Sequence, residues 1–215
     1  MDNLDRTGSR FPKEGLALPA PRMTLALAFL LLILTVPAAG GRLSKFEALK
    51  VRGVWLAVVA FAVQVLLVTI IPAGDTGVHR VAHLSTYGLV GACALMNLRQ
   101  IRFLWVVATG GLLNFLAIAA NDGVMPARPG ALEAAGLDVR EGSFANSDLV
   151  EGANLAFLGD VFAIPAGWPG ANVFSLGDVL MLAGAFLVLH AATGSCVFAA
   201  GRRQHPPQLA RPADL

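Results

Sequence analysis

Long apolar runs without charged side chains alternate with short polar segments along most of the chain. Each run is about as long as the roughly 20 residues that a helix needs to cross a bilayer. Inside hydrocarbon the backbone has to hydrogen-bond to itself, which favours helices. The pattern therefore predicts an all-α membrane protein with five transmembrane helices, at residues 23–39, 53–71, 81–98, 103–120 and 178–200.

The polar segments between and beyond these runs divide the rest of the chain. Residues 1–22 contain several prolines and no apolar periodicity, which predicts a disordered N-terminal extension. Met23 is an alternative start, and a signal peptide cleaved after the small residues at 36–39 (VPAA) is a second alternative. Residues 121–177 form the one long extracytoplasmic loop, between helices 4 and 5, and residues 201–215 form a cytoplasmic tail.

Composition agrees with a membrane environment. Hydrophobic residues make up 56% of the 215 residues and charged residues 14%, whereas a soluble domain carries about 25% charged residues. The net charge of +2 does not indicate nucleic acid, because the basic residues flank the apolar runs. We predict the lipid bilayer as a partner, no nucleic acid, and no cofactor, since no phosphate loop or dinucleotide fingerprint occurs.

Cys93 and Cys196 lie in apolar runs and are predicted to be small buried residues.

The basic residues indicate an orientation. Nine of the sixteen fall in segments that share one side if five helices alternate, namely Arg42, Lys45, Lys50, Arg52, Arg99, Arg102, Arg202, Arg203 and Arg211. Basic loops stay in the cytoplasm, so we predict that the N-terminus lies outside the membrane and the C-terminus in the cytoplasm. The basic residues within 1–22 disagree with this orientation, and a start at Met23 would remove the conflict.

The same alternation gathers polar outliers at the outer side. They are His79, His83, Asn114, Asn121, Asp122, Asp160 and Asp178. The two histidines are four residues apart and share a helix face, but no third ligand stands at a diagnostic spacing, so we predict no metal site. Gln64 and His190 fall near mid-membrane, where they either bond across helices or mark a polar path.

Asp160 and Asp178 are the best candidates for acid–base chemistry. Two carboxylates that approach each other share one proton and activate a water between them. The competing interpretation is structural, with Asp178 as the N-cap of the last helix and Asp160 closing a turn after Gly159.

Glycines punctuate the predicted helices. Gly88 and Gly91 in the third, Gly110 and Gly111 in the fourth, and Gly177 and Gly184 in the fifth are interpreted as points of close helix packing.

Three stretches resemble a bacterial family of multi-pass membrane proteins catalogued only as a domain of unknown function. The first is Gly40-Gly41-Arg42-Leu43 followed by the helix that contains Gln64, and the second is residues 121–126 (NDGVMP). The third combines residues 157–160 (FLGD) with residues 174–180 (FSLGDVL). The resemblance extends from about Met23 to Ala200. It implies a multi-pass architecture and a location in the bacterial inner membrane, but no activity, because that family has none assigned.

A fainter similarity links residues 174–178 (FSLGD) to lipoprotein signal peptidase, a four-helix intramembrane aspartyl protease. That family opens its last helix with Phe-Asn-x-Ala-Asp and carries an earlier Asn-x-x-Asp-Arg motif. Asp160 would be the earlier aspartate, but Val161 replaces the arginine and Asn154 stands six residues back.

These observations lead to three functional hypotheses. The first is a non-catalytic membrane protein that acts as a scaffold or partner for envelope components, with the protein partner unknown. The second is an aspartyl hydrolase or peptidase that acts at the outer leaflet through Asp160 and Asp178. The third is a small polar solute or cation pathway.

Overall fold

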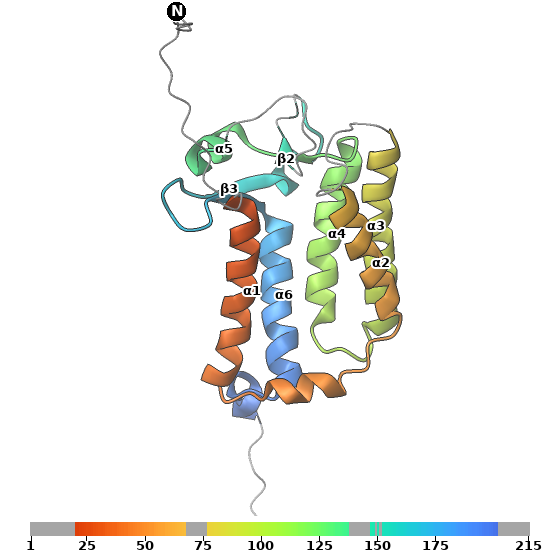
Figure 1. Cartoon of the computed structure of the whole chain (residues 1–215), viewed down its shortest axis with the longest axis vertical. Helices are drawn as coiled ribbons and strands as arrows, with labels where there is room; N and C mark the ends of the chain where they lie inside the picture. Colours follow the sequence, from red (N-terminus) through yellow and green to blue (C-terminus); the bar gives the residue numbers. More distant parts are fainter. Residues whose placement is uncertain (1–19, 68–76, 138–146, 149, 151, 202–215) are drawn as a thin grey trace, which may run out of the picture.

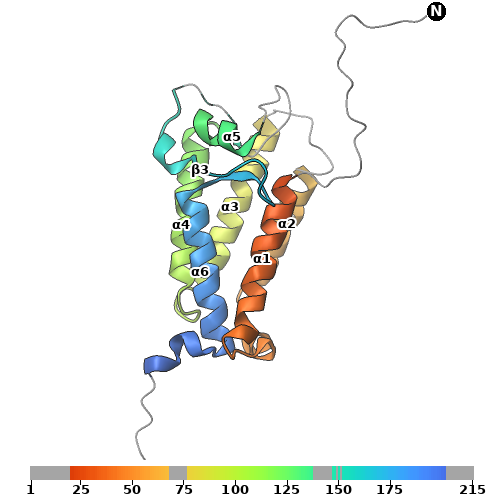
Figure 2. The same cartoon turned by 90° about the vertical axis from the view of Figure 1, so that its left-hand side faces the viewer.

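The computed structural model describes residues 20–67, 77–137, 147–148, 150 and 152–201. Long helices make up most of this part of the chain and run side by side in alternating directions (Figures 1 and 2). They are α1 (Ala20–Ala38), α2 (Val54–Val65), α3 (Gly77–Asn97), α4 (Leu104–Ala120) and α6 (Leu176–Thr193). We call them the bundle; each overlaps one of the predicted helices.

A cap of short elements between α4 and α6 lies over one end of the bundle (Figure 1). It contains β1 (Met125–Pro126), α5 (Pro129–Ala135), β2 (Ser147–Asp148), η3 (Ala156–Leu158), β3 (Asp160–Ile164) and β4 (Asn172–Ser175). β1 pairs in parallel with β2, and β3 pairs antiparallel with β4. The prediction of an all-α chain is therefore corrected to a mostly helical one, because apolar stretches of the loop pair with each other.

One feature of the cap follows from local sequence. α5 ends at Ala135, and Gly136 follows it at φ +65°. Glycine favours this left-handed conformation because it has no Cβ.

The opposite end of the bundle joins three segments. η1 (Leu43–Ala48) follows α1, a turn at residues 98–103 joins α3 to α4, and η4 (Cys196–Gly201) follows α6. The Arg42 N–H donates to the Thr193 carbonyl at 3.1 Å, and the Phe103 and Phe198 rings stack with centroids 5.1 Å apart. The sequence-based alternation is thus observed: these three segments share one end.

Two predicted boundaries need correction. The last helix was expected to run to residue 200, but α6 ends at Thr193, where Gly194 takes the left-handed conformation at φ +66° and η4 follows. The predicted disordered extension includes residues 20–22, which belong to α1. Residues 1–19, 68–71 and 202–215 lie outside the described residues, so the rest of the extension, the end of the second predicted helix and the tail stay predictions.

Large apolar side chains cover the outside of the bundle, while its inside combines polar side chains with mostly small apolar ones such as Ala60 and Ala117. Phe61, Val78 and Leu95 are 72%, 75% and 71% exposed. The buried polar residues of the bundle helices are His79, His83, Thr86, Asn97, Asn114, His190 and Thr193. A soluble helical bundle shows the reverse distribution, with its apolar stripe facing the core.

Length and hydropathy together single out one helix. Among the described residues, α6 is both long and apolar enough to cross a membrane. Residues 27–38, α2 and α4 are apolar but shorter, and α3 is long but interrupted by polar side chains. Five crossings therefore stay a prediction.

Glycine allows α4 and α6 to pack closely. A Cβ at Gly110 would lie 2.5 Å from the Gly177 carbonyl oxygen, and one at Gly184 would lie 2.7 Å from Val107. The predicted packing role is confirmed for these positions. It is wrong for Gly88 and Gly91, where a Cβ would meet no described atom within 4 Å.

Candidate functional site

Asp178 belongs to a capping box at the start of α6. The Ser175 Oγ accepts a hydrogen bond from the Asp178 N–H at 3.0 Å, and the Asp178 Oδ2 accepts one from the Ser175 N–H at 2.9 Å. Two of the helix's free N–H groups are satisfied in this way. Ser175 is therefore the N-cap, and the prediction that Asp178 is the N-cap is wrong by three residues. The Ser-x-x-Asp spacing was the sequence signal for it.

Asn114 of α4 completes this network. Its Nδ2 donates to the Asp178 Oδ1 at 2.7 Å, and its Oδ1 accepts from the Ser175 Oγ at 2.8 Å. Asn114 and Ser175 are buried, and both oxygens of the Asp178 carboxylate accept hydrogen bonds. Gly177 makes the approach possible, because a Cβ there would collide with the Asn114 amide.

Asp160 lies beside this network. It is buried, begins β3 rather than closing a turn, and stands opposite Ser175 in the β3–β4 register. Its carbonyl accepts from the Arg128 N–H at 3.0 Å. The fold thus brings the two candidate aspartates to neighbouring elements. We call Asn114, Asp160, Ser175 and Asp178 the outer polar site.

Tyr87 of α3 packs against the apolar cluster that Ala117, Ile118, Met125 and Leu158 form beside this site. The ring packs edge-on against His83, with centroids 5.5 Å apart, and tilted against Phe115.

Both predicted histidines lie in the first turns of α3, and both are buried in the bundle. The His83 Nδ1 lies 3.1 Å from the side-chain nitrogen of Gln64, which joins α2 to α3, and the Thr86 hydroxyl donates to the His83 carbonyl at 2.6 Å. His79 is 9% exposed. Within the described ranges, no three His, Cys, Asp or Glu side chains gather as a metal site would require.

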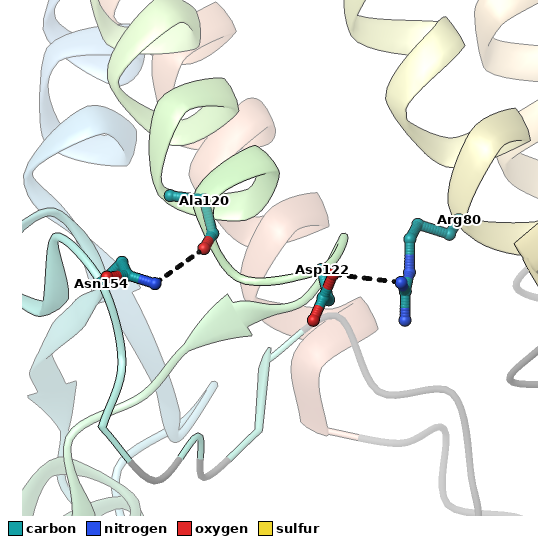
Figure 3. Close-up of polar contacts among 4 residues, drawn as sticks. All are labelled: Arg80, Ala120, Asp122 and Asn154. Carbon is teal, nitrogen blue, oxygen red and sulfur yellow. Dashed lines mark hydrogen bonds and ion pairs between the residues drawn. The ribbon is translucent and has the colours of Figure 1, made fainter.

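Asn121 and Asp122 lie at a polar groove under the cap. The Asn121 Nδ2 donates to the Asn154 carbonyl at 2.7 Å, and its Oδ1 accepts from the Asn154 N–H at 2.8 Å. Figure 3 shows Asn154 donating in turn to the Ala120 carbonyl, and Asp122 paired with Arg80 at 3.1 Å. The groove has a volume of about 360 Å³. The asparagine pair fastens the cap to the end of α4.

His190 forms a separate network near the end of the bundle opposite the cap. The Thr35 hydroxyl donates to the Leu32 carbonyl at 2.6 Å and lies 3.0 Å from the His190 Nε2. The His190 Nδ1 lies 2.6 Å from the Ser195 hydroxyl oxygen on the other side of the ring. Gln64, Asn114 and His190 thus bond to different partners in three networks. A polar pathway would have them line one cavity.

Comparison with known proteins places the chain in a family. A model described as a family of unknown function, DUF5317, matches residues 48–190. The chain belongs to this family. The family match includes α2, α3, α4, the cap and most of α6, and begins after the Gly40–Leu43 motif. The resemblance to a domain of unknown function is confirmed. No curated protein and no solved structure matches the chain.

Proposed function

We propose that this member of the DUF5317 family is an integral protein of the bacterial inner membrane whose five long helices cross the bilayer. The observation that carries the proposal is the inverted distribution of side chains in the bundle. Exposed Val, Leu, Phe and Trp side chains on every bundle helix would aggregate in water but match the acyl chains of lipid. Polar groups of the bundle interior bond to one another, as they must when no water is present.

The proposed role is non-catalytic, as a scaffold or partner for envelope components outside the membrane. The capping box and Asn114 occupy both oxygens of the Asp178 carboxylate, which supports a structural task for that residue. The asparagine pair holds the cap on the bundle, so the cap offers a fixed outer surface. Its polar groove beside Arg80 and Asp122 is the part of that surface best suited to a polar partner.

Thiol labelling tests the orientation. Cys93 is buried as predicted, but the same prediction is wrong for Cys196, which is exposed in η4 after the end of α6. The variant Cys93→Ser therefore leaves one accessible thiol. We expect a membrane-impermeant maleimide to label Cys196 in inverted vesicles and not in intact spheroplasts. In a matched variant, Cys93→Ser and Cys196→Ser are combined with Trp168→Cys at the cap, where Trp168 is 69% exposed. This thiol should show the opposite pattern.

Alkaline carbonate extraction provides the companion measurement. An integral protein stays in the membrane pellet at high pH, because its apolar helices have no stable place in water. Release into the supernatant would contradict the proposal. Labelling of both thiols from the same side would contradict the orientation of the bundle.

A second candidate function is hydrolysis of a substrate at the outer leaflet by Asp160 and Asp178. The observation that favours it is the β3–β4 register, which sets Asp160 opposite the serine that hydrogen-bonds to Asp178. Like charges held close raise one carboxyl pKa, which is how a pair of aspartates shares a proton.

The variant Asp160→Asn separates these two functions. If the site is a hydrolase, the variant should accumulate normally in the membrane yet fail to restore the phenotype of a deletion strain. If Asp160 only holds the cap, abundance and phenotype should fall together. Glu133→Gln in α5 is the matched control, because it removes one exposed acid of the same cap.

A further inference from the structure

Six exposed cations gather at the end of the bundle opposite the cap. They are Arg42, Lys45, Lys50, Arg52, Arg99 and Arg102, and we call them the basic end. The one acid of these segments is Glu47, and none of the six forms a salt bridge with a described residue. Unpaired cations at such density attract an anionic partner.

Several of these cations are held in place rather than on a loose tail. The Lys45 Nζ would lie 2.8 Å from a Cβ at Gly194, so it stands over the C-terminus of α6, where the helix dipole favours positive charge. The Arg102 guanidinium lies 4.6 Å from the Phe103 ring centroid and 5.4 Å from that of Phe198. The Arg52 backbone is bonded on both sides by the buried Asn97 side chain.

Apolar and aromatic side chains mark a membrane interface beside the basic end. Trp55 in the first turn of α2 and Trp105 in the first turn of α4 are 64% and 61% exposed. Tryptophan gathers at the level of lipid headgroups, because its ring is apolar and its N–H is polar. η1 lies across this end of the bundle (Figure 1) and exposes Leu43 and Phe46 next to Lys45.

We propose that the basic end binds the headgroups of anionic phospholipids in the cytoplasmic leaflet. Lysine and arginine donate to phosphate oxygens, and a headgroup with net negative charge is preferred over a zwitterionic one. A flat lipid surface fits better than a protein or nucleic acid, because the tryptophans and η1 border the cations with side chains that insert into the headgroup layer. This inference rests on the proposed membrane integration, yet it can fail while integration holds.

Tryptophan quenching in reconstituted vesicles tests the proposal. The variant Trp168→Phe leaves Trp55 and Trp105 as the fluorophores, since the chain has three tryptophans. Brominated phosphatidylglycerol should quench them at lower mole fraction than brominated phosphatidylethanolamine. At 1 M salt, where the Debye length falls to about 3 Å, the difference should shrink. Adding Lys50→Gln and Arg99→Gln should lower the preference by up to about thirtyfold, because each of the two cations contributes about 1 kcal/mol near the surface.

The matched control removes the same charge from the other end of the bundle, through Arg80→Gln and Arg128→Gln. This pair should leave the quenching preference unchanged. Equal quenching by the two lipids would overturn the proposal even if the protein stays in the vesicle. An equal loss of lipid preference in the control variant would overturn it as well. Equal quenching together with binding of polyglutamate in detergent would assign the basic end to an acidic protein partner instead.

Discussion

Gly110→Ala should destabilise the bundle by about 1–3 kcal/mol or more, which is the cost of overpacking a close-packed interior. The new methyl group would lie 2.5 Å from the Gly177 carbonyl oxygen and 2.8 Å from the Met181 backbone nitrogen. Both neighbours are backbone atoms, so α4 and α6 would have to move apart rather than adjust a side chain. Thermal unfolding in mild detergent, followed by circular dichroism, measures the effect.

Gly111→Ala provides a matched control on the same helix turn. A Cβ there would meet only the Met181 sulfur at 4.0 Å, which is ordinary contact. Alanine is better than glycine in a helix by about 1 kcal/mol, so this variant should be as stable as the parent or more stable. A similar loss in both variants would mean that α4 and α6 do not pack as described.

Asp178→Asn should cost about 2–3 kcal/mol of stability although it preserves the shape of the side chain. The native carboxylate accepts from the Asn114 amide through one oxygen and from Ser175 through the other. An amide has one oxygen, so its NH₂ group would face another donor, and a charge-assisted bond would be lost. The same thermal unfolding measurement reports this loss.

Asp122→Asn is the comparison, because it makes the same chemical change at an exposed aspartate. The Asp122 side chain is 85% exposed and pairs with Arg80, and such surface pairs contribute about 1 kcal/mol or less. Asparagine also tolerates the left-handed backbone of residue 122, at φ +58°. Equal unfolding temperatures for Asp178→Asn and the parent would show that the outer polar site is not part of the structural framework.

The local sequence was sufficient to predict the bundle helices and some of the helix ends. The apolar runs predict the bundle helices, because a long run without charged residues is a property of the local sequence alone. Gly136 marks the end of α5, and the Ser-x-x-Asp spacing contains the start of α6. The early end of α6 was missed, because residues 195–200 are as apolar as the helix before them and only Gly194 signals the break.

The cap and the site depended on contacts between distant segments. β3 and β4 are short, and their register arises from pairing across a turn, which no periodicity within either strand specifies. Gly88 and Gly110 look alike in sequence, yet only Gly110 faces another helix backbone. The sequence predicts that both histidines lie at the start of the third helix, but only the packing of α2 against α3 brings His83 to Gln64.

Sequence by itself determined the apolar character of the long helices, their alternation and the position of the cations at one end, because composition acts residue by residue. Only the tertiary structure decided that Asn114 and Ser175 bond to Asp178, that Asp160 stands opposite Ser175, and that the polar residues form separate networks. Those contacts join residues far apart in the chain. Their geometry depends on which helix faces pack together, and many faces of similar composition could have done so.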